Sequence, residues 1–460
     1  MSGSDGVATA INDTIAAIAT PPGVSGLAVI RLSGPLSIDI ANSVFRGGDL
    51  RESASHTLRY GKIRDARDDL LDDVLVAVFH APHSYTGENS IEISCHGGSI
   101  VSRIVLEALL AAGARHANPG EFTRRAFING RMDLTQAEAV ADIIHAQSVQ
   151  AHRASVRQLE GSLSRYVSGM RDSLIHCAGL LELNLDFVEE GIDVLANERP
   201  KEEMLATRGQ IAKALESFES GRILRDGARV VLLGKANTGK SSLLNAVLGM
   251  QRAIVTEIPG TTRDYIEEQV MLHGAYLRFV DTAGLRETDD AVEREGLAMG
   301  RALLQAADIV CGVVDEDDET FVASLREDAL AIGAEFLHVR NKIDLLDSAC
   351  SGLIGGTHYV SAIRGDGLEE LTREIARVAG AMLAPCEAGT VLVTNARHAD
   401  CLRRSLDSVD AALQAMDDGL SEEFIAVEVR TAITALGEII GAVTTDDILN
   451  TVFARFCIGK

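Results

Sequence analysis

The sequence lacks tryptophan and holds only 12 phenylalanines and 6 tyrosines among its 460 residues. This scarcity argues against a protein whose main task is to stack unpaired nucleic-acid bases on aromatic side chains. Basic residues are also a minority, because 43 lysines and arginines stand against 67 aspartates and glutamates, for a formal net charge of −24. So acidic a chain binds phosphate backbones poorly by itself, and a nucleic-acid substrate would require a basic partner.

Cysteine pairs and long apolar runs are missing as well. The seven cysteines are scattered, odd in number and never spaced as CxxC, which argues against a disulfide framework or a structural zinc site. No run of 18 apolar residues could span a membrane, and residues 1–12 lack the basic and apolar regions of a signal peptide. The sequence therefore predicts a cytoplasmic protein with no membrane segment.

A glycine-rich loop, Gly234–Ser242, fits the pattern G-x-x-x-x-G-K-[ST]. Glycines let backbone N–H groups turn toward phosphate oxygens, while Lys240 reaches the β- and γ-phosphates and the Ser241 hydroxyl ligates Mg²⁺. The apolar run Ala228–Leu233 predicts a preceding strand, and Ser242–Leu248 predicts the start of a helix whose N-terminus favours anions. Strand, loop and helix in this order predict a nucleoside triphosphate site.

Two later loops contain the residues that would contact the γ-phosphate and its metal ion. Thr256–Thr262 follows the predicted helix, and a threonine at this spacing completes the coordination of Mg²⁺ and senses the γ-phosphate. Asp281–Gly284 follows the apolar strand Leu277–Val280. There Asp281 would hold the metal through water, and the Gly284 N–H would contact the γ-phosphate.

Two further loops identify the base as guanine. Asn341–Asp344 follows the strand Phe336–Arg340, and Asp344 can accept hydrogen bonds from the N1–H and 2-amino groups of guanine, which adenine cannot offer. Taken alone, this aspartate could instead be a helix-capping residue. Ser361 and Ala362 follow the strand Thr357–Val360 and can meet the guanine O6. All these loops occur in the right order, each after a strand or the P-loop helix, and together they predict that the bound nucleotide is GTP.

The predicted GTP-binding residues are Asn237, Thr238, Gly239, Lys240, Ser241, Ser242, Thr256, Glu257, Ile258, Pro259, Gly260, Thr261, Thr262, Asp281, Thr282, Ala283, Gly284, Asn341, Lys342, Asp344, Ser361 and Ala362.

One position departs from the pattern of Ras-type proteins. Leu285 stands directly after Asp281–Gly284, where those proteins have the glutamine that orients the attacking water. An apolar side chain cannot orient water, so another residue or dimerisation must do so. Arg263 and Arg286 are candidates to neutralise charge in the transition state, although each fits an ordinary surface or switch-loop charge better.

The length and the 46% of hydrophobic residues predict two to four globular domains. Residues 13–131 mix strand and helix patterns. Strands are expected at Thr14–Ala19, Gly26–Leu32, Asp73–Phe79 and Ser90–Ser94, a helix at Ser99–Ala112, and loops at His83–Asn89, Cys95–Gly98 and Asn118–Asp133. Helical periodicity covers about 136–190, 199–223, 395–417, 421–440 and 444–455, on both sides of the strand–helix alternation at 226–384.

These patterns predict a multidomain α/β plus α fold. An N-terminal α/β domain would occupy residues 1–131, and a discontinuous helical domain 132–224 and 386–460. A Ras-like P-loop G domain at 225–385 would be inserted between the two helical parts, because helices on both sides of it need partners for their apolar faces.

Several further segments, with the nucleotide motifs, resemble the tRNA-modification GTPase family called MnmE or TrmE over nearly the whole chain. They are Ala19–Gly23, Ile30–Gly34, Ser84–Asn89, Cys95–Gly98, Pro119–Ala137 and Phe456–Lys460. The resemblance implies that the N-terminal domain binds 5-formyl- or methylene-tetrahydrofolate and mediates a homodimer. It also implies a heterotetramer or larger complex with the FAD-dependent partner MnmG (GidA). Together the two proteins would add an aminomethyl or carboxymethylaminomethyl group to C5 of wobble uridine 34 in tRNA. The alternative is a regulatory or ribosome-assembly GTPase, which would need neither the N-terminal domain nor the terminal Phe456–Lys460 segment.

The resemblance also assigns roles to individual residues. It implies K⁺-dependent hydrolysis controlled by pairing of G domains, with water positioned by Glu293, which alone would pass for a solvated helix charge. The implied K⁺ ligands are Asn237, Thr256, Ile258 and Thr261, the Mg²⁺ ligands Ser241 and Thr262, and the folate-binding residues Arg31, Glu92, Arg131 and Lys460.

Some of these assignments leave alternatives open. Arg31 and Glu92 alone would suit an ordinary ion pair, Arg131 stands where the family usually has lysine, and Ala236 replaces a common proline. Cys457 lies four residues from the C-terminus between basic residues, which could lower its pKa and make it reactive. It could equally be a small packing residue, so its role beside Glu293 in catalysis is a hypothesis.

Overall fold

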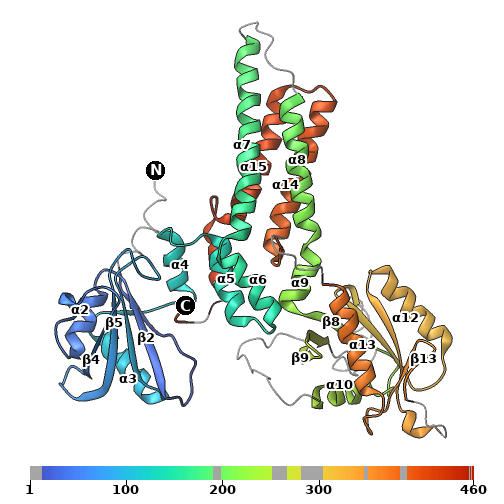
Figure 1. Ribbon diagram of the computed structural model, residues 1–460, viewed down its shortest axis with the longest axis horizontal. Helices are drawn as coiled ribbons and strands as arrows, with labels where there is room; N and C mark the ends of the chain where they lie inside the picture. Colours follow the sequence, from blue (N-terminus) through green and yellow to red (C-terminus); the bar gives the residue numbers. More distant parts are fainter. Residues whose placement is uncertain are drawn as a thin grey trace, which may run out of the picture. The chain divides into compact units, whose positions relative to one another are not determined.

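The computed structural model describes residues 13–189, 198–250, 267–280, 304–346, 351–383, 391–454, 456 and 458–460 (Figure 1). Contacts divide the chain into two compact units, each treated separately below. The first unit comprises Met1–Ile144, Arg157–Asp172 and Ile433–Lys460, and the second comprises His145–Val156 and Ser173–Ala432. Within the described ranges, every helix is too short or too polar to cross a membrane.

The first unit contains a seven-stranded sheet in the order β3-β4-β5-β6-β2-β1-β7. Its pairs are antiparallel except for β1 with β7. The strands are β1 (Ile15–Ile18), β2 (Leu27–Ser33), β3 (Phe45–Arg46), β4 (Thr57–Arg64), β5 (Leu70–Phe79), β6 (Ser90–His96) and β7 (Arg115–His116). The predicted strands and the helix α3 (Ser99–Ala111) are confirmed, whereas α2 (Ser37–Val44) and β4 were not predicted.

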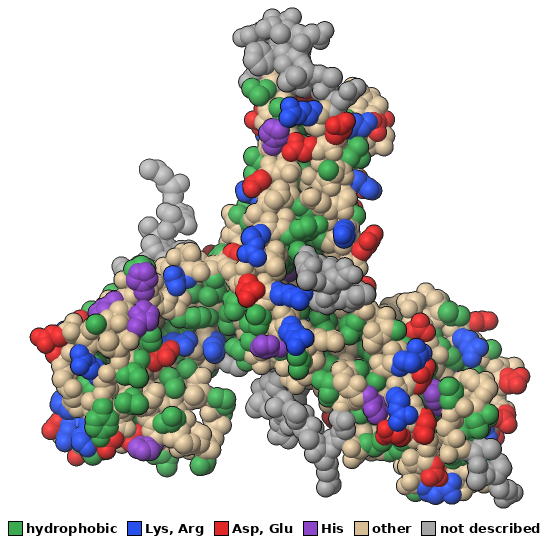
Figure 2. Space-filling view, viewed as in Figure 1, with side chains coloured by type: hydrophobic (Ala, Val, Ile, Leu, Met, Phe, Trp, Pro, Cys, Tyr) green, Lys and Arg blue, Asp and Glu red, His purple; other side chains and the backbone are tan. Residues whose placement is uncertain are grey.

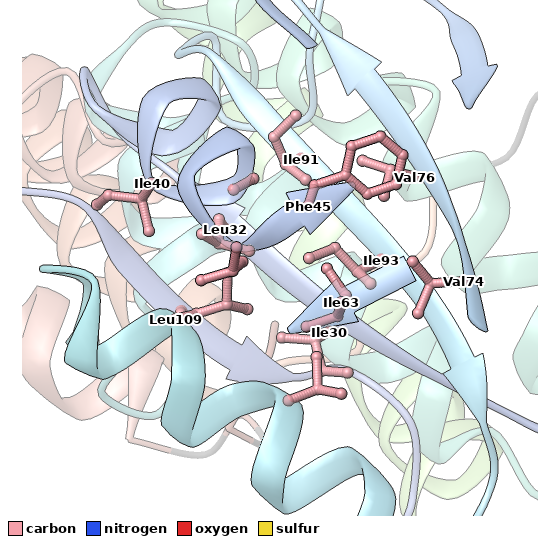
Figure 3. Packing of buried hydrophobic residues seen from close by; sticks show 14 of the residues in the cluster. Ile30, Leu32, Ile40, Phe45, Ile63, Val74, Val76, Ile91, Ile93 and Leu109 are labelled. Atoms are coloured by element: carbon pink, nitrogen blue, oxygen red, sulfur yellow. The ribbon is translucent and has the colours of Figure 1, made fainter. Parts of the chain in front are cut away.

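The core of this unit lies on one face of the sheet, against α2 and α3 (Figure 3). Side chains alternate along each strand, so Ile30 of β2 and Ile93 of β6 face one another in the core, together with Leu109 of α3. All three are completely buried, and such burial stabilises the fold by roughly 1.5–3 kcal/mol per side chain. The same alternation sends Arg31 and its neighbour Glu92 to the opposite face.

The segment 118–133, which was predicted to be a loop, contains the helix α4 (Glu121–Ile128). That prediction was wrong because Gly120 and Gly130, both at positive φ, bracket only two turns, too few for a clear period. Buried Phe122 and Ala126 nonetheless share one face of α4 at a spacing of four. In the same unit, α5 (Leu134–His145) and α16 (Asp446–Phe453) share an apolar cluster that includes Leu134, Phe453 and Phe456.

The second unit contains a sheet in the order β13-β14-β12-β11-β8-β10-β9. Its five central strands are parallel and its two edge strands antiparallel. The strands are β8 (Ala228–Leu233), β9 (Glu267–Leu272), β10 (Ala275–Val280), β11 (Ile309–Val314), β12 (Glu335–Arg340), β13 (Gly352–Ile354) and β14 (Thr357–Tyr359), and the helices are α10 (Lys240–Gly249), α12 (Glu319–Ala331) and α13 (Leu368–Ala381). Such sheets bind ligands at the carboxyl ends of their strands.

Long helices precede and follow this sheet in the chain. They are α6 (Val149–Leu159), α7 (Ser162–Glu189), α8 (Glu198–Glu216), α9 (Phe218–Asp226), α14 (Ala396–Asp417) and α15 (Glu422–Ile440). Helices α8 and α14 pack together, and Arg208 pairs with Asp410 across them. Segments about 200 residues apart in sequence therefore meet, and the multidomain α/β plus α fold is confirmed.

Candidate functional site

The P-loop follows β8 and ends at the N-terminus of α10, which begins at Lys240, two residues before the predicted start. Gly239 caps the helix with a φ of +85°, and a Cβ there would lie 2.4 Å from the Asn341 amide nitrogen. A Cβ on Gly234 would lie 2.1 Å from the Val313 carbonyl oxygen. Both motif glycines are therefore required by the geometry, and the first turn of α10 presents its N–H groups to an anion.

Side chains of the P-loop hydrogen-bond to its own backbone. Lys240 Nζ donates to the carbonyl oxygens of Gly234 and Lys235, both at 2.8 Å. Thr238 Oγ1 donates to the same Lys235 carbonyl at 3.0 Å. Asn237 adopts a φ of +64°, which lets the chain turn back sharply between the two glycines. The ammonium group of Lys240 is thus held over the loop that would surround the phosphates.

Asn341, which is 1% exposed, connects three of the predicted nucleotide loops. Its amide nitrogen donates to the Thr238 carbonyl oxygen at 3.0 Å, and its amide oxygen accepts from the Ala362 N–H at 3.2 Å. These loops follow β8, β12 and β14, which are parallel strands of one sheet. The structure therefore brings the described parts of the predicted GTP site together at one edge.

Asp344 lies in the short 3-10 helix Ile343–Leu345 and is partly exposed. Ser361 Oγ donates a 2.5 Å hydrogen bond to Asp344 Oδ1. This bond lowers the pKa of Asp344, so the carboxyl is ionised at neutral pH. An ionised carboxylate only accepts hydrogen bonds, and it matches the two donors on the guanine edge.

Several predicted residues lie outside the described part of the chain. They are Thr256, Glu257, Ile258, Pro259, Gly260, Thr261, Thr262, Asp281, Thr282, Ala283, Gly284, Leu285, Glu293 and Cys457. Of the predicted ligands for K⁺ and Mg²⁺, the structure thus describes only Asn237 and Ser241. Among the described residues, no cluster of His, Cys, Asp and Glu has the arrangement of a metal site.

A second group of predicted residues lies in the first unit around Arg31. Its guanidinium binds Glu92 Oε1 at 2.7 Å and stands over the rings of Tyr85 and Phe122, at 5.2 and 5.7 Å from their centroids. Arg31 Nη1 is buried and lacks a hydrogen-bond partner among the described residues. An oxygen of a bound group would suit this place, because it could accept from the orphaned N–H.

The other two predicted folate residues lie on segments near this sheet. The Arg131 side chain packs beside Gly87, where an added Cβ would lie 3.2 Å from Arg131 Cγ. Gly459, with a φ of +97°, brings the C-terminal tail against β1, so that a Cβ would lie 2.4 Å from the Ile18 carbonyl oxygen. This contact brings the segment that ends in Lys460 to the strand next to β2.

Two features of the sites were not predicted. Tyr85 and Phe122 flank Arg31, and both lie in segments already picked out for the family resemblance, which was a usable signal. The second is an acidic loop, Asp315–Glu319, which follows β11 at the same sheet edge as the nucleotide loops. In sequence it has the composition of any solvated turn.

Comparison with known proteins identifies the family of the chain. The model "MnmE helical domain" matches residues 134–457, and "GTP-binding protein TrmE N-terminus" matches residues 14–131. A protein named tRNA modification GTPase MnmE from Heliobacterium modesticaldum is 44% identical over 98% of this chain and 100% of its own length. The same name is given to a protein from Moorella thermoacetica, 42% identical over 98% and 100%, and to one from Symbiobacterium thermophilum, 43% identical over 97% and 99%. Among solved structures, the G domain of the T. maritima FeoB iron transporter is 25% identical over 33% of this chain and 98% of its own, with a TM-score of 0.25. The chain belongs to the MnmE (TrmE) family of tRNA modification GTPases.

Proposed function

We propose that this protein hydrolyses GTP and, with the FAD-dependent partner MnmG, adds an aminomethyl or carboxymethylaminomethyl group to C5 of wobble uridine 34 in tRNA. The observation that carries the GTPase part is Asn341, whose amide joins the P-loop to the loop of Ser361 and Ala362 beside Asp344. One set of hydrogen bonds thus aligns a phosphate cradle with a guanine-reading carboxylate.

The described residues suggest how the phosphates would be held. The N-terminus of α10 and the Lys240 ammonium would stabilise negative charge on the β- and γ-phosphates. Ser241 lies in the first turn of α10 and is partly exposed, so its hydroxyl suits one position around Mg²⁺, with Thr262 as the proposed second ligand. When bound, Mg²⁺ would neutralise charge on the β- and γ-phosphate oxygens.

K⁺ is proposed to take the place of an arginine finger. Asn237 Oδ1, with Thr256, Ile258 and Thr261, would supply its oxygen ligands, and Glu293 would position the attacking water. Pairing of two G domains would complete this site. The left-handed backbone of Asn237 is compatible with the proposal, because asparagine adopts this conformation readily in tight turns.

GTP hydrolysis should therefore depend on the monovalent cation. We expect the rate in K⁺ to exceed the rate in Na⁺ at equal ionic strength by about 10-fold or more. A cation that fits the site poorly stabilises the transition state less, and each 1.4 kcal/mol or so added to the activation free energy lowers the rate about tenfold. Phosphate release at saturating GTP would measure both rates. Equal rates would contradict the K⁺ mechanism but not the guanine site, which GDP binding tests separately.

The N-terminal domain is proposed to bind 5-formyl- or methylene-tetrahydrofolate and to form a homodimer. Arg31, Arg131 and Lys460 would hold the glutamate carboxylates, and Glu92 would accept from the amino and N–H edge of the pterin. The orphaned Arg31 Nη1 supports this assignment, because it lacks a hydrogen-bond partner among the described residues. We also propose the boundaries of the three domains: 1–131 for the N-terminal domain, 132–224 with 386–460 for the helical domain, and 225–385 for the G domain.

tRNA affinity is proposed to come mainly from MnmG, within a heterotetramer or larger complex in the cytoplasm. The formal net charge of this chain is −24, and the face drawn in Figure 2 shows acidic and basic side chains interspersed over the described residues. Analysis of wobble nucleosides in tRNA from a deletion strain, with and without the partner, tests the modification activity. Unchanged uridine 34 modification in that strain would refute it.

Cys457 is proposed to act in or beside the modification chemistry. A Cys457→Ser variant should lose most wobble-uridine modification while its GTP hydrolysis rate changes less than twofold, because serine keeps the size of the side chain but not its nucleophilicity. Mass spectrometry of tRNA nucleosides and a phosphate-release assay would measure the two effects. If modification levels stay at those of the natural protein, Cys457 is only a packing residue.

A further inference from the structure

The acidic loop Asp315–Glu319 follows β11 and ends at the first residue of α12, beside the P-loop. Three of its carboxylates pair with basic residues from the strands and loops that form the nucleotide site. The pairs are Asp315 Oδ2 with Lys342 Nζ at 2.7 Å, Asp317 Oδ1 with Arg340 Nη1 at 3.1 Å, and Asp318 Oδ2 with Lys235 Nζ at 2.5 Å.

Asp318 makes two kinds of contact at once. Its Oδ1 accepts the Phe321 N–H at 3.1 Å and caps α12, while its Oδ2 binds Lys235. Lys235 Nζ also stands 5.3 Å from the centroid of the Phe321 ring. The hydrogen bond from Lys235 is the main cause that lowers the pKa of Asp318 to about 2, so the carboxylate is charged throughout the physiological range.

Lys235 is the second residue of the P-loop, and its backbone carbonyl is an acceptor within the loop. That oxygen receives hydrogen bonds from Lys240 Nζ at 2.8 Å and from Thr238 Oγ1 at 3.0 Å. The far half of the loop is held by Asn341, which donates to the Thr238 carbonyl oxygen. The P-loop therefore has two anchors, Asn341 on the buried side and Asp318 on the exposed side.

We propose that Asp318 is a positioning residue for the nucleotide, and that its ion pair with Lys235 keeps the first half of the P-loop in the conformation that receives phosphates. The inference rests on the proposed GTPase function and deepens it, because it names what sets nucleotide affinity at that site. A loop ordered in advance loses less conformational freedom when GTP or GDP binds, so binding is tighter.

Positioning and long-range electrostatics predict opposite results for one substitution. Removing the charge of Asp318 leaves fewer negative charges near an anionic ligand, which by itself should tighten nucleotide binding. Loss of the anchor should weaken it. The variant Asp318→Asn separates these effects cleanly, since asparagine is as good a helix cap as aspartate and leaves α12 intact.

The test is equilibrium binding of a fluorescent GDP analogue to the full-length protein, with KM and kcat for GTP. We expect Asp318→Asn to raise the Kd and the KM by about two- to fivefold, the range for an exposed ion pair, with kcat and melting temperature unchanged. Glu316→Gln is the matched control, because Glu316 is exposed in the same loop, and it should leave the Kd unchanged or slightly lower.

Lys235→Met tests the other end of the pair. It should also raise the Kd. The double variant Lys235→Met with Asp318→Asn should bind the GDP analogue no more weakly than Lys235→Met alone, because both substitutions remove the same ion pair. A Kd for Asp318→Asn equal to or below that of the natural protein would overturn the inference and leave the GTPase proposal standing. Absence of GDP binding by the natural protein would overturn both.

Discussion

An Asp344→Asn variant is expected to lose its preference for GTP and to prefer xanthosine triphosphate. Guanine presents two donors, its N1–H and 2-amino groups, to the ionised carboxylate of Asp344. Two charge-assisted hydrogen bonds at roughly 1.5–3 kcal/mol each correspond to a loss of about 10²–10⁴ in affinity. Asparagine would instead direct its NH₂ group at the 2-amino group of guanine, and two donors cannot pair.

Xanthine reverses this match. It carries a carbonyl oxygen at C2 in place of the amino group, so an asparagine can donate to that oxygen and accept from N1–H. Ser361 should support the new side chain, since its hydroxyl, now 2.5 Å from Asp344 Oδ1, can donate equally well to an amide oxygen. The substitution that weakens the binding of GTP should therefore strengthen the binding of xanthosine triphosphate.

Competition binding against a fluorescent nucleotide would measure both affinities. Asp366→Asn is the matched control, because this carboxylate lies five residues after Ser361 and pairs with Arg364 at 2.8 Å on the surface. That variant should keep the preference for GTP. An Asp344→Asn protein that still binds GTP more tightly than xanthosine triphosphate would show that another residue reads the base.

The nucleotide site could be predicted from the sequence because its chemistry is local. Each of its loops is a short run of residues at the end of an apolar strand, and parallel strands necessarily bring their carboxyl ends to one edge. Asn341 illustrates the limit. Its motif indicated guanine binding, but its hydrogen bond to the Thr238 carbonyl, about 100 residues away in sequence, depends on strand order.

Very short elements and features that depend on tertiary packing were not predicted. Helix α4 was missed because two turns between glycines show no clear period. The acidic loop has the composition of a solvated turn, and only β11 lying beside β8 brings Asp318 to Lys235. Likewise, the residue types of Arg31 and Glu92 alone suggested the ion pair that the structure shows, and the family resemblance implied folate contacts, whereas the position of two aromatic rings beside Arg31 became clear only from the fold.

The second large effect is expected at Arg125, a buried arginine of α4 that is 5% exposed. Its guanidinium binds three carboxylates, those of Asp13 at 2.5 Å, Glu121 at 3.0 Å and Glu88 at 3.3 Å. It also donates to the Asp13 carbonyl oxygen at 2.9 Å. Arg125→Met would preserve most of the side-chain volume but leave partly buried carboxylates without their cation.

Removing one partner of a buried ion network costs far more than the network itself contributes, because uncompensated charges stay buried. We expect Arg125→Met to lower the free energy of unfolding of the N-terminal domain by about 3 kcal/mol. Arg115 limits the loss, since it also binds Asp13 and Glu121, both at 2.6 Å. Glu88 has less support, because apart from Arg125 its carboxylate has only the Ser33 hydroxyl as a partner among the described residues.

The loss should depend on pH in a defined direction. Burial opposes ionisation of Asp13 and Glu121, but hydrogen bonds from Arg115 and Arg125 outweigh it and leave the pKa of both carboxyls below their ordinary values. Groups whose pKa is lower in the folded state stabilise it fully above their unfolded pKa, near pH 4. That contribution is lost as the pH falls through the lowered folded values, so natural protein and variant should converge in acid.

Scanning calorimetry of the full-length protein at pH 7 and at about pH 2, below the unfolded pKa values of these carboxyls, would measure this difference. The relevant transition is the one that saturating GDP does not shift, because ligand binding stabilises only the domain that binds it. Arg124→Met is the matched control, because this neighbour on α4 is 35% exposed, its partner Asp446 is 63% exposed, and their charged atoms are 3.6 Å apart. The Arg124→Met substitution should therefore lower the free energy of unfolding by less than about 1 kcal/mol. If Arg125→Met destabilises no more than Arg124→Met, or if its effect is the same at both pH values, the carboxylates around Arg125 are not held in their charged form by that guanidinium.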